Sequence, residues 1–278
     1  MAEGLQEALD FKAESEAVSA LLSSLSDADY NTITQFKDWT IYDILAHLHL
    51  WNKAADWTLN EPAKFASLMG DVIQVFQGGK THQDLQRGWC EQQGLETGTK
   101  LYAAWRETFA KTTDNYVSAN PDKRVKWGGP DMSTRSCIIA RQMETWAHAQ
   151  AIFDVLGQTR IDADRLKNVA HIGVTTYSWS FKVNGLEPIL PKPYIRLTAP
   201  SGDIWEWNEP PNEKDKQDNK LEGRATEFSQ VVTQCRNIGD TSLKMTGEAA
   251  TKWMNIAQCF AGGAETPPPA GSRHRKKG

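Results

Sequence analysis

A carboxylate and an imidazole one helical turn apart constrain this chain more than any other feature. Glu144 and His148 are four residues apart, so a helix stacks their side chains on one face. The predicted helix, from about Thr134 to Gly157, is apolar on nearly every side, as is typical of a central, buried helix. Because an isolated buried charge is costly, the pair needs either a mutual hydrogen bond or a metal ion, and the spacing alone leaves both open.

An earlier predicted helix offers a third ligand. It begins after Thr40, a good N-cap, with Asp43 where a capping box places its acid, and it runs to about residue 59. His47 lies at the flank of its apolar face, so we expect it to face the interior. His49 points well away from that face and is expected to meet solvent. His49 is therefore the rival, less favoured ligand.

His47, Glu144 and His148 together predict a site for one divalent metal ion, zinc before others. Three nitrogen and oxygen ligands leave coordination positions open, which is typical of catalytic rather than structural zinc sites. An open position can bring the pKa of a bound water or thiol close to neutrality. A low-molecular-weight thiol is thus a possible cosubstrate or cofactor.

The remaining periodicity predicts an all-α N-terminal half followed by a smaller α+β half. Before residue 134, further helices are expected over 5–25, 61–80 and 81–116, the last with a break or kink at Gly94 or Gly98. After residue 157 we expect helices over 166–181, 222–236 and 248–260, strands over 194–199, 204–208 and 242–245, and a polar loop over 209–222. The predicted domains are a helical bundle at 1–160, an α+β domain at 161–262, and a disordered Pro-rich, basic tail at 263–278.

Composition limits the partners. The net charge is −4, and four of the 31 basic residues gather near the C-terminus, so the body of the chain is acidic and does not suit nucleic acid. No stretch approaches the roughly 18 uncharged residues of a membrane span, and the first residues, Met1–Gly4, lack the basic start of a signal peptide. The four cysteines are far apart, which suggests reduced thiols. We therefore expect a cytoplasmic monomer or homodimer with a small-molecule substrate and no membrane partner.

Several segments resemble a known family. Trp39–Thr40 with Asp43–Leu48, and later Met143–His148, resemble the metal-site segments of DinB-like helical bundles. The branch they resemble is the metal-binding subgroup of the mycothiol-dependent maleylpyruvate isomerase family. Further segments similar to that subgroup are Trp127–Ser133, Asp240–Leu243, Gly247, Trp253 and Ala257–Gly262.

The resemblance implies a DinB-like four-helix bundle joined to an α+β domain related to sterol carrier proteins. It also implies that His47, Glu144 and His148 bind a divalent metal, usually zinc. One position departs from the pattern: relatives commonly carry Asp three residues after the last ligand, where this chain has Ala151. If that Asp tunes the site or contacts the substrate, the family's chemistry does not carry over unchanged.

The function predicted from these features is a metal-assisted, thiol-dependent transferase or isomerase that acts on a small electrophile. Arg141, one turn before Glu144, either steers an anionic group or pairs structurally with a carboxylate. Arg224 and Arg236 are further catalytic candidates, expected with the tryptophan-bearing hairpin 204–208 to wall a cleft at the metal. The alternative is a non-enzymatic protein that binds a small hydrophobic ligand and holds a structural metal.

Overall fold

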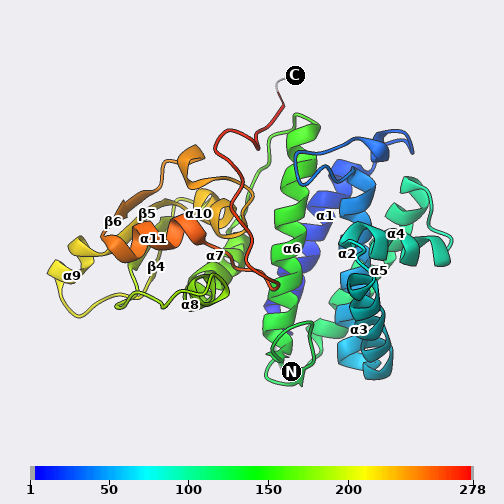
Figure 1. Cartoon of the computed structure of the whole chain (residues 1–278), viewed down its shortest axis with the longest axis horizontal. Coiled ribbons are helices and arrows are strands. Elements are labelled where there is room, and N and C mark those ends of the chain that lie inside the picture. The colour runs from blue at the N-terminus through cyan, green and yellow to red at the C-terminus, as the bar shows by residue number, and fades with distance from the viewer. Residues whose placement is uncertain (1–3, 277–278) are drawn as a thin grey trace. The chain divides into compact units, whose positions relative to one another are not determined.

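The computed structural model describes residues 4–276 and divides into two units, between Gly157 and Gln158. Figure 1 shows the chain, which is mostly helical with a small sheet region, as predicted. Residues 1–3, used above to argue against a signal peptide, and residues 277–278 of the basic tail lie outside the described part. No helix among the described residues combines the length and apolarity that a membrane span requires.

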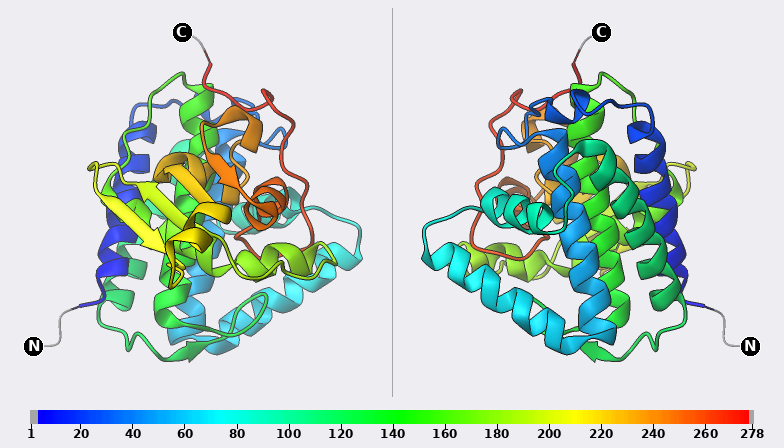
Figure 2. Two further views of the ribbon diagram at one scale, coloured as in Figure 1. Left: turned by 90° about the vertical axis from the view of Figure 1, so that its left-hand side faces the viewer. Right: turned by 90° about the vertical axis from the view of Figure 1, so that its right-hand side faces the viewer.

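Unit 1 is built on four long helices that pack lengthwise around one shared core (Figure 2). These are α1 (Gln6–Leu22), α2 (Ile41–Asn60), α5 (Gly98–Val117) and α6 (Thr134–Val155). The smaller elements are η1 (Asp29–Asn31), α3 (Pro62–Gln77), α4 (His82–Gln92) and a ribbon of β1 (Arg124–Val125) with β2 (Met132–Ser133). The core includes the fully buried Phe11, Trp105 and Tyr116.

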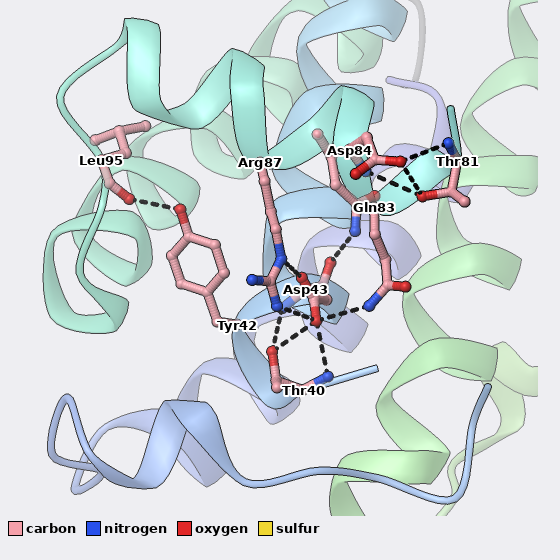
Figure 3. Close-up of polar contacts among 9 residues, drawn as sticks. Thr40, Tyr42, Asp43, Thr81, Gln83, Asp84, Arg87 and Leu95 are labelled. Atoms are coloured by element: carbon pink, nitrogen blue, oxygen red, sulfur yellow. Dashed lines mark hydrogen bonds and ion pairs between the residues drawn. The ribbon is translucent and has the colours of Figure 1, made fainter. Parts of the chain in front are cut away.

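The start of α2 is fixed by a charged network around Asp43 (Figure 3). Thr40 and Asp43 form the predicted capping box. The Asp43 carboxylate also accepts hydrogen bonds from Arg87 Nε at 2.5 Å and Nη2 at 2.8 Å, and from Gln83 Nε2 at 3.1 Å, both on α4. Because His47 lies one turn after Asp43, this network fixes the part of α2 that carries the candidate ligand.

The expected break between residues 81 and 116 is real and lies at the two predicted glycines. Gly94 has φ +70°, a left-handed conformation that ends α4 and suits glycine. A Cβ at Gly98 would collide with the ring of Tyr30, so the first turn of α5 needs a residue without a side chain. The segment thus forms two helices, α4 and α5, where one interrupted helix was predicted.

α6 has the predicted ends. Ser133 is its N-cap, and its hydroxyl accepts a hydrogen bond from the backbone N–H of Ser136 at 3.1 Å. Gly157, with φ +67°, follows its last turn. Residues on several sides of α6 are buried, among them Ile138, Trp146 and Ile152, which confirms the prediction of a central helix.

Unit 2 contains a four-stranded mixed sheet with helices. The strand order is β4–β3–β5–β6, with β3 parallel to β5 and the other pairs antiparallel. The strands are β3 (Tyr194–Thr198), β4 (Ile204–Trp207), β5 (Lys220–Arg224) and β6 (Lys244–Thr246). The helices are η2 (Asp164–Leu166), α7 (Lys167–Thr175), α8 (Tyr177–Val183), α9 (Glu213–Asp218), α10 (Ala225–Val232), η3 (Ile238–Asp240) and α11 (Glu248–Ile256).

Two boundaries in unit 2 differ from the sequence prediction. The polar segment 209–222 was predicted as a loop, but it contains α9 and the start of β5. Leu221 is the fully buried apolar side chain of β5, so apolar and polar residues alternate only weakly in this strand. Its backbone pairs with β3 and β6, which makes it an inner strand. The helix predicted over 166–181 is divided near Thr176 into α7 and α8.

Part of the segment predicted as a tail has hydrogen-bond partners in unit 2. Residues 264–276 contain no helix or strand, and side-chain hydrogen bonds join several of them to unit 2. Gln234 Nε2 donates to the carbonyl of Glu265 at 2.9 Å, and Asn237 Nδ2 donates to that of Pro268 at 2.8 Å. Arg273 Nη1 donates back to the carbonyl of Gln234 at 2.6 Å. Composition could not reveal these partners, which tie down a terminal segment.

Candidate metal centre

The three predicted ligands meet inside unit 1, between α2 and α6. His47 Nε2 lies 3.2 Å from Glu144 Oε2, and His148 Nε2 lies 3.1 Å from the same oxygen. The ring centroids of the two histidines are 4.5 Å apart. One ligand atom from each of the three residues lies within 4.8 Å of the others, a grouping able to hold one metal ion. The spacing of Glu144 and His148 along α6 therefore produces the predicted convergence with His47.

The electrostatics of this cluster leave a negative charge without a full counter-charge. Burial alone would raise the pKa of Glu144, but hydrogen bonds from His148 and His47 outweigh it and hold that pKa well below its usual range. Burial, with the nearby charge of His148, lowers the pKa of His47 to about 4, so its imidazole is neutral at neutral pH. An ionised carboxylate beside a neutral imidazole suits a cation.

Aromatic rings enclose the two histidines. Trp39 stacks on His148 with centroids 5.8 Å apart and planes 4° apart, and Phe36 meets the same ring edge-on at 4.9 Å. Trp51 lies 6.2 Å from His47. These rings exclude water from the imidazole faces and restrict their orientation. The side chains keep 12% exposure at each histidine and 20% at Glu144, so an ion can still reach them.

The donor set fits a divalent metal. Two imidazole nitrogens and one carboxylate oxygen are common zinc ligands, and coordination positions would remain for other molecules. The Nδ1 atoms of His47 and His148 are buried and have no hydrogen-bond partner among the described residues. Zinc-binding histidines usually donate that second N–H to an acceptor, and this support is worth about 10- to 100-fold in affinity. The site is thus chemically suited to a metal but lacks that reinforcement.

Arg141 lies beside the cluster on α6 and is 2% exposed. Its Nε donates to Asn52 Oδ1 at 3.1 Å, while its Nη2 and Asn52 Nδ2 are buried donors without a partner among the described residues. The guanidinium charge acts on both His47 and Glu144. No carboxylate within ion-pair distance of Arg141 occurs in the described part, so the structural pairing considered for this residue is with a neutral amide.

The two other arginine candidates belong to unit 2. Arg224 is the N-cap of α10 and Arg236 follows α10, and their catalytic role stays a prediction.

The expectation that His49 meets solvent is wrong: it is 2% exposed and lies 5.4 Å from the ring of Trp89. α4 covers the face of α2 that a single amphipathic helix would expose, so the sequence pattern was misleading.

Sequence reasoning missed two contributors to this region. Asn52 is fully buried and holds Arg141, but asparagine on a helix gives no signal of its own. Phe36 was not connected to the site because its contact with His148 depends on the helix packing. Trp39 had a usable signal, since it directly precedes the capping box that positions His47.

Two sequence comparisons find relatives of this chain. A family model described as "Mycothiol maleylpyruvate isomerase N-terminal domain" matches residues 11–153. An uncharacterized protein of Mycobacterium tuberculosis, present in strains CDC 1551 and H37Rv, is 31% identical over 257 residues, covering 91% of this chain and 94% of the relative. The matched family segment contains all three candidate ligands and Arg141.

Among solved structures, an alanine mutant of the mycothiol-dependent maleylpyruvate isomerase is similar with a TM-score of 0.50. The sequences are 12% identical, and the alignment covers 81% of this chain and 87% of the other. At that identity the likeness supports a shared fold and nothing finer.

Proposed function

We propose, because the chain belongs to the mycothiol maleylpyruvate isomerase family, that it is a metal-assisted, thiol-dependent isomerase or transferase acting on a small electrophile. The convergence of His47, Glu144 and His148 is the observation that carries this proposal. In the same proposal, unit 1 is a DinB-like four-helix bundle and unit 2 an α+β domain of the sterol-carrier-protein type.

The metal would be held by His47, Glu144 and His148, and we propose zinc. A divalent cation there supplies Lewis acidity, which lowers the pKa of a thiol and favours its reactive thiolate form. The chain's own contribution is to present two imidazole nitrogens and one ionised oxygen on the packed helices α2 and α6. Rigid helices hold such ligands more accurately than loops do.

Arg141 is the residue proposed to orient an anionic substrate. Its guanidinium is buried, acts electrostatically on the cluster and retains an unpartnered Nη2 donor. A substrate carboxylate would supply the acceptor that Nη2 lacks among the described residues, and guanidinium–carboxylate hydrogen bonds fix orientation well. Asn52 then acts as a positioning residue, because it holds Nε of Arg141.

The reaction class follows from the names of the family and of the similar structure, which specify mycothiol and maleylpyruvate. A thiolate adds to one carbon of an alkene conjugated to a carbonyl group, so a C–S bond forms and the C=C bond becomes single. Rotation about that bond and expulsion of the thiolate restore the alkene with the other geometry. The thiol is regenerated, which is the balance expected of a cofactor.

The competing proposal is a binding protein for a small hydrophobic ligand with a structural metal. The rings of Phe36, Trp39 and Trp51 around the cluster are the observation in its favour. Ala151, in place of the Asp expected from the family pattern, lies on α6 three residues beyond His148. The family's substrate is therefore not assumed for this chain.

The test is a turnover assay of zinc-loaded protein with maleylpyruvate and a panel of small unsaturated acids, with mycothiol or other low-molecular-weight thiols. We expect turnover that requires both thiol and metal and falls at least 100-fold in Glu144→Gln. Arg141→Lys should raise KM for carboxylate substrates more than it lowers kcat. A metal-loaded protein inert with every thiol and electrophile contradicts the enzyme proposal and favours the binding protein.

A further inference from the structure

A second cavity lies on the opposite side of α2 from the metal cluster. It is a groove of about 300 Å³ between α2, α4 and α5, lined by His49, Lys53, Trp89, Leu95, Ala104 and Thr108 among others. Cavities that bind small molecules begin at about this volume. Neither His47, Glu144 nor His148 lines it. The groove is therefore separate from the site proposed for catalysis.

The inner wall of the groove contains a histidine with no partner. His49 is 2% exposed, and its Nδ1 is enclosed without a hydrogen-bond partner among the described residues. An imidazole ring can donate an N–H, and Nε2 is the ring nitrogen left to meet a molecule in the groove.

Lys53 supplies a positive charge to the same wall. It lies four residues after His49, so both side chains project from one face of α2. Lys53 is half-buried and has no ion pair with any described carboxylate. Lys111, by contrast, pairs with Asp56 at 3.1 Å, so its charge is already matched. Glu107, also in the lining, is exposed, and water screens its charge.

The rest of the lining combines apolar and polar side chains. Trp89 is half-buried and lies 5.4 Å from His49, and Leu95 and Ala104 add apolar surface beside Gln93 and Thr108. The ammonium group of Lys53 and an N–H of His49 can bind an anionic group, and the indole of Trp89 can pack against an apolar one. We infer that this groove binds a small carboxylate with an apolar body, its carboxylate on Lys53 and His49 and its body against Trp89.

This inference does not depend on the proposed catalysis, and the test separates the two. Binding of benzoate and hexanoate to the full chain would be measured by calorimetry, with benzyl alcohol as the uncharged comparison. We expect saturable binding of both carboxylates and weaker binding of the alcohol. Lys53→Gln should lower the affinity for benzoate about tenfold or more, because a hydrogen bond to a charged group is lost. Trp89→Leu should lower that affinity several-fold.

Two controls identify the site. His148→Ala, in the metal cluster, should leave benzoate binding unchanged, and so should Lys12→Gln, which lies on α1 in a different groove. Glu107→Gln should leave affinity unchanged or increase it, because a nearby negative charge is removed. The inference is overturned by the absence of saturable binding, or by affinity unaffected by Lys53→Gln. Binding lost in His148→Ala but kept in Lys53→Gln also overturns it, since the carboxylate is then bound at the metal.

Discussion

Asp43 and Glu144, two carboxylates of unit 1, lie in polar clusters of different kinds. Asp43 is fully buried, and its oxygens accept hydrogen bonds from Thr40, Gln83 and Arg87, including a two-point contact with the guanidinium. Among residues 4–276, Glu144 has hydrogen bonds only with the two imidazoles, and that of His47 is neutral. The first network is complete within the protein, while the second has a negative charge and open donor atoms.

The difference shows which polar cluster is structural and which needs another molecule. A buried charge persists when its neighbours satisfy it, as Arg87 and the capping box satisfy Asp43. The ionised carboxylate of Glu144 has no such guanidinium contact within the described residues. A bound cation would supply the missing positive charge. The two clusters should therefore respond in opposite ways to mutation and to metal removal.

The largest expected effect is on stability at the complete network. Asp43→Ala removes the carboxylate that accepts the backbone N–H of Thr40 in the capping box and that pairs with Arg87, and should lower the free energy of unfolding by about 3 kcal/mol. This loss of stability is smaller than for a fully buried ion pair, because the Arg87 side chain is 53% exposed and water can solvate it. Urea denaturation measures it. The folded fraction of this variant should still bind metal. A variant as stable as the native protein but without metal would contradict a purely structural role for the Asp43 network.

A smaller effect concerns His49, which is buried and has no hydrogen bond to a carboxylate among the described residues. Its folded pKa of about 3 lies below the unfolded value near 6.5, so the unfolded state takes up the proton first. Its contribution to stability is therefore present above pH 6.5 and is lost as the pH falls towards 3. Between pH 6.5 and pH 4.5 the loss should be about 2–3 kcal/mol. His49→Phe should remove that part of the pH dependence, as seen in urea denaturation at several pH values. An unchanged pH profile would contradict the burial of a neutral His49.

The smallest effect tests the support of α6. Ser133→Ala removes the N-cap hydrogen bond to Ser136 and should lower stability by about 1 kcal/mol. Ser133→Asp, which keeps a capping acceptor, is the matched control and should be nearly neutral. Because the cap lies about three turns from Glu144, metal content should not change in either variant. A change in metal content would show that the position of α6 is less firmly fixed than its packing indicates.

Much of this architecture could be predicted from local sequence signals. The capping box at Thr40 and Asp43 and the glycine after α6 are local and were interpreted correctly. The four-residue spacing of Glu144 and His148 likewise brings their side chains together on α6. What failed depends on contacts between distant segments. α4 buries His49, and β3 and β6 turn the polar segment of β5 into an inner strand. Periodicity in one segment cannot show which neighbour covers it.

The central claim is that His47, Glu144 and His148 form a metal site, and metal content tests it most directly. Untagged protein would be purified without chelators and measured by elemental analysis, together with His47→Ala, His148→Ala and the control His49→Gln. His49 is on the same helix as His47 and is equally a histidine, but it lies outside the cluster. We expect close to one divalent metal, zinc, per chain in the native protein and in His49→Gln, and almost none in the other two variants. Metal retained by both His47→Ala and His148→Ala would contradict a metal site at these residues.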